Sequence, residues 1–192
     1  MRFLPLALAA LAFAPAAQAQ LLPSISLGVA GGPNFASLND VGAELENSTG
    51  YHVGVYGDIS VPFVSFRTGV FYLKAGDVES STTTTTADFI TVPVDLRFST
   101  PTPVVQAYAL AGPEFRFPVG GEEDGLVVET KSVNVAANVG AGVSFNPPLV
   151  GPSGFLELRY SQDVTAFAEE AGLTTENEYK LSMVQLRLGI GL

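Results

Sequence analysis

The sequence predicts an all-β fold, an eight-stranded antiparallel up-and-down transmembrane β-barrel. Residues 21–192 contain eight segments in which apolar and polar residues alternate, and the connections between them are alternately long and short. Such a meander has all its short turns at one end and all its long loops at the other, so its two ends face different compartments. Hydrophobic residues make up 47% of the chain, yet after residue 19 no continuous apolar stretch could form a membrane helix. We therefore expect the membrane to be crossed by strands.

Residues 1–19 are expected to be a cleaved secretory signal peptide. Arg2 supplies a minimal basic start, residues 3–14 form a short apolar core, and Ala17-Gln18-Ala19 is a small-x-small cleavage site. The mature chain would begin at Gln20, and residues 20–192 have the size of a single domain. Export through this signal predicts a location in the outer membrane as a multi-pass barrel.

The eight strands follow from the period of two residues. The last is the clearest, because Val184, Leu186, Leu188 and Ile190 alternate with small or polar residues. The polar faces of the strands, opposite the aliphatic ones, are rich in Gly, Ala, Ser and Asn. These residues suit the crowded inside of a narrow barrel better than a solvated surface. Apolar side chains are thus expected outside and polar ones inside. The predicted strands are 24–37, 51–59, 64–75, 88–98, 104–117, 132–145, 154–163 and 179–192.

The connections differ in composition as well as length. Those at 60–63, 99–103 and 146–153 are short and contain proline, which donates no ladder hydrogen bond and ends a strand. Those at 38–50, 76–87, 118–131 and 164–178 are long, polar and acidic, and the threonine run 82–86 is expected to form a loop tip. The chain carries a formal net charge of −10, which these four connections account for. Because acidic loops repel phosphates, nucleic acid is not an expected partner.

Inside the barrel, strand parity predicts a network of five basic and five acidic side chains. Charges in a narrow lumen of low dielectric must be paired to be tolerated, and arginine can bind a carboxylate through two parallel hydrogen bonds. We expect a plug of salt bridges; the alternative is an ion pathway lined by the same residues. The predicted lumen charge network is Asp58, Arg67, Asp95, Arg97, Glu114, Arg116, Glu157, Arg159, Asp163 and Arg187.

Catalytic and metal sites have little support in the sequence. Cysteine is absent and His52 is the one histidine, so thiolate and histidine metal clusters are excluded. Any catalytic triad would have to include His52, which is better explained as an inward polar residue. We predict no enzyme activity, no cofactor and no metal.

Aromatic residues are expected to form interfacial belts, with Phe63, Phe98, Phe145 and Phe155 near the short turns and Tyr51, Tyr72, Phe115, Phe117 and Tyr179 toward the long loops.

Eight stretches in order resemble a known family. They include "STGYHVGVYGDISV", "VSFRTGVFYLKAGD", "ITVPVDLRF", "LELRYSQDVT" and the terminal "VQLRLGIGL". Together they resemble the outer-membrane protein β-barrel domain, of the porin-like PorT type found in Bacteroidetes-like bacteria. The resemblance implies an eight-stranded outer-membrane barrel and supplies no catalytic residues.

The function expected from these observations is that of a porin-like integral outer-membrane protein. Its role would be structural, surface-interacting or weakly permeable, with a plugged lumen. Its partners would be outer-membrane lipid and an extracellular or envelope protein that binds the long loops, and we expect a monomer. One alternative is a soluble exported lipocalin-like carrier with apolar residues facing a ligand cavity. A barrel enzyme that modifies lipids is the third possibility.

Overall fold

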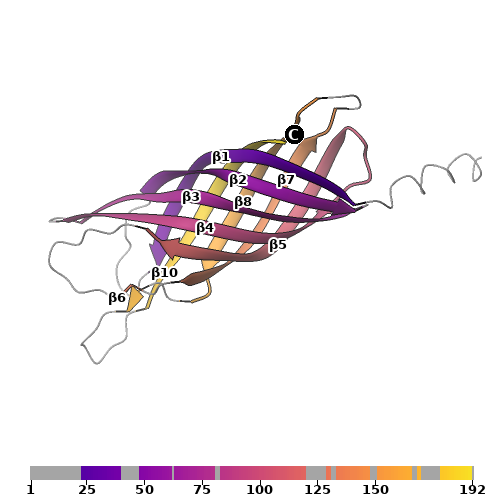
Figure 1. Cartoon of the computed structure of the whole chain (residues 1–192). Helices are drawn as coiled ribbons and strands as arrows, with labels where there is room; N and C mark the ends of the chain where they lie inside the picture. The colour runs from indigo at the N-terminus through magenta and orange to yellow at the C-terminus, as the bar shows by residue number, and fades with distance from the viewer. Residues whose placement is uncertain are drawn as a thin grey trace, which may run out of the picture.

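The computed structural model describes residues 23–39, 48–61, 63–80, 83–119, 129–130, 133–147, 151–165, 168–169 and 178–191. Eight long strands within these ranges close into an antiparallel barrel (Figure 1). They are β1 (Ser24–Asn39), β2 (Ser48–Val61), β3 (Val64–Ser80), β4 (Thr83–Ser99), β5 (Val105–Pro118), β7 (Asn134–Phe145), β8 (Ser153–Asp163) and β10 (Glu178–Gly191).

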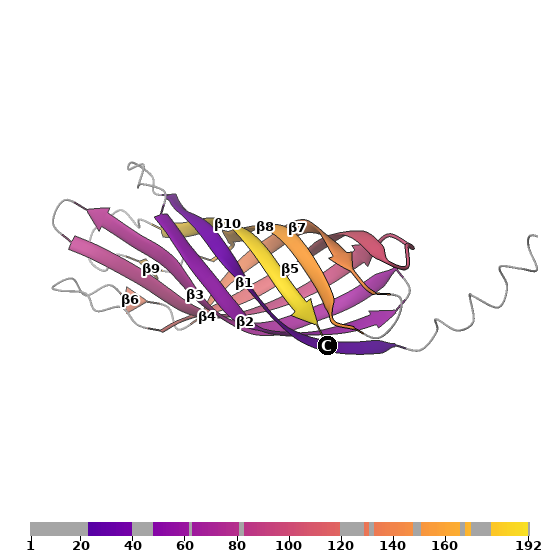
Figure 2. The same cartoon turned by 90° about the horizontal axis from the view of Figure 1, so that it is seen from above.

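The barrel is closed by the first and last strands. Each strand pairs with its neighbour in the chain, and β1 also pairs antiparallel with β10 in a register that runs from Gly28 opposite Gly191 to Asn39 opposite Lys180. Figure 2 shows these two strands side by side. Closure removes both sheet edges, so the backbone donors and acceptors of all eight strands can be satisfied within the sheet. The predicted fold class is confirmed.

The strand boundaries agree with the predicted ones except in β3 and β4. The interval 76–87 was predicted to be a loop with the threonine run at its tip, and this is wrong. A register shift after Lys74 and Asp88 is followed by the pairs Asp77–Thr86 to Ser80–Thr83, which lengthen the hairpin beyond the other strands (Figure 1). Threonine is β-branched and favours extended backbone, which outweighs the low hydrophobicity of the run.

Two short strands add to the sheet at the end with the long connections. They are β6 (Glu129–Thr130) and β9 (Ala168–Glu169), and β9 pairs with both β6 and β10. The acidic positions of the long connections that lie outside the described residues are Asp40, Glu44, Glu46, Glu122, Glu123, Asp124, Glu170 and Glu176. None of the described residues forms a helix with the length and hydropathy needed to span a bilayer.

Alternate side chains along each strand face opposite sides of the barrel wall. In β8, Phe155, Glu157 and Arg159 are buried while Leu156 and Leu158 are exposed. The exposed positions elsewhere are also large and apolar: Ile25 is 74% and Leu188 is 61% accessible. An aliphatic surface of this extent around a closed barrel matches the hydrocarbon of a membrane.

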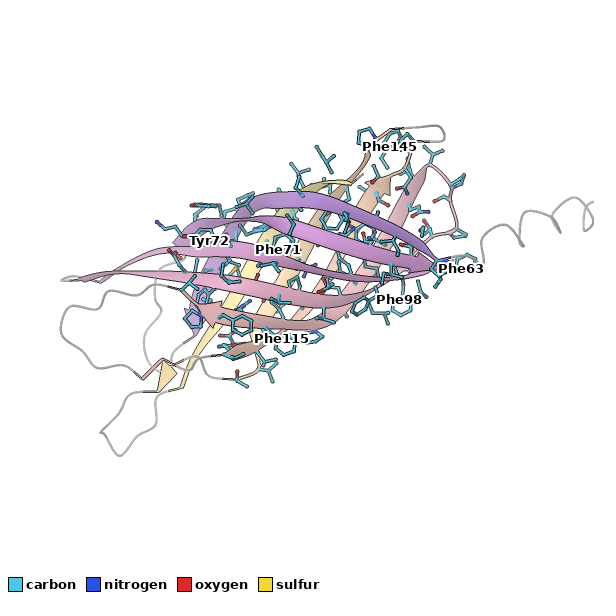
Figure 3. The ribbon with its side chains drawn as sticks, in the orientation of Figure 1. Phe63, Phe71, Tyr72, Phe98, Phe115 and Phe145 are labelled. Atoms are coloured by element: carbon cyan, nitrogen blue, oxygen red, sulfur yellow. The ribbon has the colours of Figure 1, made fainter. Side chains whose placement is uncertain are left out.

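The short turns bring the chain back at one end. Only two residues connect β2 to β3, since Val61 pairs directly with Val64, and Phe63 adopts a positive φ of 70°. A positive φ at the second central position is what a type II turn requires. In Figure 3, Phe63, Phe98 and Phe145 all lie toward this short-turn end, whereas Tyr72 lies toward the other. All three phenylalanines are at least half exposed, as an interfacial belt requires.

Candidate functional site: the charged lumen

The barrel interior contains all ten charged residues that strand parity places there. None is more than 6% accessible. Their strands are not all neighbours, so the closed barrel brings together charges that are distant in sequence. The ten positions are Asp58, Arg67, Asp95, Arg97, Glu114, Arg116, Glu157, Arg159, Asp163 and Arg187.

At the short-turn end, Asp58 of β2 is shared by two arginines. Arg67 of β3 donates to both carboxylate oxygens, with Nη2 at 2.7 Å from Oδ2 and Nε at 3.0 Å from Oδ1. Arg97 of β4 donates from Nη1 to the same Oδ2 at 3.1 Å. The bidentate pair satisfies the carboxylate, so Arg97 is held by a single further bond.

Midway along the lumen, Glu157 and Asp95 surround Arg159. The Nη2 of Arg159 lies 2.6 Å from Asp95 Oδ2 and 3.0 Å from Glu157 Oε1. Glu157 Oε2 also accepts from Tyr108 at 2.9 Å and lies 3.4 Å from Nη1 of Arg67, which links this group to the Asp58 group. The two groups therefore form one continuous ionic chain.

Toward the long-connection end, Arg116 binds two carboxylates. Its Nε lies 2.8 Å from Glu114 Oε1, and its Nη1 lies 2.7 Å from Asp163 Oδ1. Asp163 Oδ2 accepts from Asn134 at 3.0 Å and from the Leu181 amide at 3.0 Å. Every oxygen of Asp163 thus has a donor, which is what a buried carboxylate needs.

Arg187 differs from the other four arginines. Within the described residues it forms no ion pair; its Nε donates to His52 Nε2 at 3.2 Å and its Nη2 to Gln185 Oε1 at 3.1 Å, while Nη1 has no partner. Its guanidinium lies 4.1 Å from the centre of the Phe71 ring. The structure therefore places Arg187 in the lumen beside neutral groups, apart from the ion pairs.

Aromatic rings stack on the lumen arginines, a feature that the sequence analysis missed. Arg67 lies over Tyr56 at 4.6 Å and over Phe155 at 4.1 Å, and Arg97 lies over Tyr108 at 4.0 Å. The expectation that Phe155 belongs to the interfacial belt is wrong, because its side chain is 8% accessible and packs inside. Its parity with Glu157 and Arg159 was the signal that could have placed it there.

A second apolar group lies inside the barrel toward the long connections. Leu73 of β3, Phe89 of β4 and Met183 of β10 are each at most 2% accessible, and they pack with Ala36 and Leu181. The lumen is therefore filled by salt bridges over part of its length and by apolar side chains over another part.

Comparison with known proteins places the chain in a family. The model of the outer membrane protein beta-barrel domain matches residues 4–191. The chain belongs to this family. It is accordingly an outer-membrane β-barrel protein, with the aliphatic belt of the strands in contact with lipid.

Several solved structures are similar to the chain. Neisserial surface protein A is similar at 12% identity with a TM-score of 0.54, over 87% of this chain and 98% of that one. Ail, the attachment invasion locus protein of Yersinia pestis, solved in complex with the heparin analogue sucrose octasulfate, is 15% identical with a TM-score of 0.46, over 88% and 99% of the two chains. The N-terminal β-barrel domain of Pseudomonas aeruginosa OprF is 14% identical with a TM-score of 0.40, over 87% and 99%. No curated protein sequence matches the chain.

Two alternatives can be judged for this outer-membrane barrel. The lipocalin-like carrier is wrong, since the aliphatic faces point outward and the charged ones inward. In a catalytic triad His52 would have to act as the base, but it is 1% accessible and its Nε2 already accepts from Arg187. Among the described residues no group of His, Asp and Glu has the arrangement of a metal site.

Proposed function

We propose that this outer-membrane barrel is a plugged cylinder with a structural or surface-interaction role. The observation that carries the proposal is the continuous ionic chain from Asp58 through Glu157 to Asp95. Removing one member of a buried ion pair leaves the other charge without compensation, so such a chain resists opening. Eight strands leave an interior just wide enough for side chains.

The packing of neutral groups supports the same role. Tyr108 both accepts the Arg97 guanidinium on its ring and donates to Glu157, so it holds two ionic groups together. The apolar group of Leu73, Phe89 and Met183 offers no polar path for a hydrated ion. Together these contacts favour a plug over a selective pathway.

A surface role would belong to the long connections. Their acidic composition supports binding of an extracellular or envelope protein with a basic face. The proposal also includes export by a cleaved signal peptide at residues 1–19 and membership of the PorT type within the family. Surface crosslinking in intact cells would identify such a partner. Loss of the crosslink after exchange of Glu122, Glu123 and Asp124 for the corresponding amides is the expected result, and an unchanged crosslink would contradict a role for this connection.

The plug is tested by conductance and solute release. We expect the folded protein in planar bilayers and lipid vesicles to show no stable conductance and no release of sugars. The double variant Glu157→Ala, Arg159→Ala removes both charges of the central pair and should raise ion leakage. Leu158→Ala, between them on the lipid face, is the matched control and should behave as wild type. Stable wild-type conductance with permeation by sugars or amino acids would overturn the plug and favour a minor permeability role.

A further inference from the structure

The short-turn end of the lumen holds a cavity with both polar and apolar lining residues. Its volume is about 870 Å³, which lies within the range of small-molecule sites. Tyr56 and Phe155, which pack edge to face with ring centres 5.4 Å apart, form part of its lining. Hydroxyl groups from several strands line it as well: Ser24, Ser60, Ser65, Ser99, Ser144 and Ser153.

The cavity lining carries more positive than negative charge. Its charged side chains are Asp58, Arg67 and Arg97. Asp58 already accepts three hydrogen bonds from Arg67, at 2.7, 3.0 and 3.1 Å. Arg67 also lies 3.4 Å from Glu157 Oε2, which is not part of the cavity lining, whereas within the described part of the chain Arg97 reaches Asp58 alone.

Arg97 is the under-coordinated member of this group. Its side chain is buried and has one ion pair among the described residues, the 3.1 Å contact of Nη1 with Asp58 Oδ2. Its Nε is buried without a hydrogen-bond partner. By contrast, Arg159 and Arg116 each reach two carboxylates. A buried cation with spare donors is stabilised when an anion completes its coordination.

The guanidinium of Arg97 is also held in a fixed position. It lies 4.0 Å from the centre of the Tyr108 ring, and Tyr108 is itself anchored by its hydrogen bond to Glu157. A preorganised donor binds a ligand without losing the conformational entropy of a free arginine side chain. Ser144, whose Oγ is buried with no hydrogen-bond partner, lines the same cavity.

We infer that the short-turn cavity binds a single carboxylate or phosphate group, with Arg97 as the main anchor and serine hydroxyls as supporting donors. Short turns of outer-membrane barrels lie on the periplasmic side, so the ligand would approach from there. The binding site is an addition to the proposed role as a plugged barrel. It is compatible with the plug, because the ligand enters only the mouth of the barrel.

Titration with inorganic phosphate and with acetate tests the site. The full chain, folded in micelles of an uncharged detergent, is expected to bind at least one of the two anions saturably by calorimetry. Arg97→Gln should weaken that affinity by about tenfold or more, since a charge-assisted bond is lost. Lys74→Gln, which removes the same charge from the outer wall, should leave the affinity unchanged. Absence of saturable binding of both anions, or equal affinity in Arg97→Gln, would overturn the inference.

A measurement on the wild-type protein does not depend on the folding of a variant. The amide resonances of Ser65, Ser99 and Ser144 should shift with phosphate or acetate, while that of Asn134 at the opposite end should not. Shifts spread over both ends, or none, would overturn the site. Phosphatidylglycerol added to the micelles separates the two sources: displacement of the bound anion supports a lipid headgroup, and undiminished binding supports a free anion.

Discussion

Arg159 of β8 and Asp95 of β4 are joined across the lumen, with 2.6 Å between Nη2 and Oδ2. Their strands are separated in the sheet by β5 and β7, so the contact exists only in the closed barrel. Both side chains are fully buried. The pair therefore links opposite sides of the wall, and its loss should affect the stability of the whole barrel.

Arg159→Met should lower the free energy of unfolding by about 3–5 kcal/mol, because Asp95 and Glu157 would lose their shared partner in a buried site. Urea titration of the protein in lipid vesicles, followed by the difference in gel mobility between folded and unfolded chains, measures the change. Leu158→Met on the lipid face is the control and should stay within about 0.5 kcal/mol of wild type. A loss for Arg159→Met no larger than the control would contradict the network.

Gly142→Ala should destabilise the barrel by about 1–3 kcal/mol through overpacking. A Cβ at this position would lie 2.6 Å from the Tyr108 ring and hydroxyl and 2.5 Å from the Leu156 carbonyl oxygen. Gly154→Ala on the neighbouring strand meets only the Gly189 carbonyl oxygen at 3.6 Å, an ordinary contact, and serves as control. Comparison of the two urea midpoints tests the prediction, and equal midpoints would contradict it.

Leu158→Arg should cost about 2–4 kcal/mol and Val105→Arg about 0–1 kcal/mol, since the penalty for a charge on the lipid face depends on depth. Both positions are 57% accessible, but Leu158 is central in β8 and Val105 is the first residue of β5. The same urea titration in vesicles distinguishes them. Equal costs would mean that the aliphatic belt is not centred on the membrane as the strands suggest.

Replacement of residues 79–84 by Asn-Gly should leave the barrel folded. The pair Val78–Thr85 would then be closed by a two-residue turn, and the pairs from Lys74–Asp88 to Val64–Phe98 would remain. Heat-modifiable gel mobility and the urea midpoint should match wild type within error. Failure to fold would instead show that the hairpin extension is needed for assembly.

The strand pattern and the inward position of the charges were readable from sequence. In β8 the period of two places Glu157 and Arg159 on one face and Leu158 on the other, and the small residues of the polar faces indicate which face is inside. The same rule placed Phe155 inside, but its aromatic character favoured a belt position in the sequence analysis. Parity is the stronger signal, because one residue of slip would turn the whole strand over.

The ion-pair partners could not be predicted in this way. Parity identifies five arginines and five carboxylates, but it is silent on the shear of the barrel, which sets the height of each residue in the lumen. As a result, Arg116 and Arg159 each hold two carboxylates while Arg187 bonds to His52 and Gln185. The single ion pair of Arg97 at the short-turn cavity has the same origin.

By itself, the sequence determined the number of long strands, their approximate limits and the face of each that meets lipid, because these depend on local alternation and on turn residues between strands. Tertiary structure alone decided which charges meet, how far β3 and β4 extend, and where the lumen remains open as a cavity. Those properties depend on inter-strand register and on barrel closure, which bring side chains together from strands that are not neighbours in the chain.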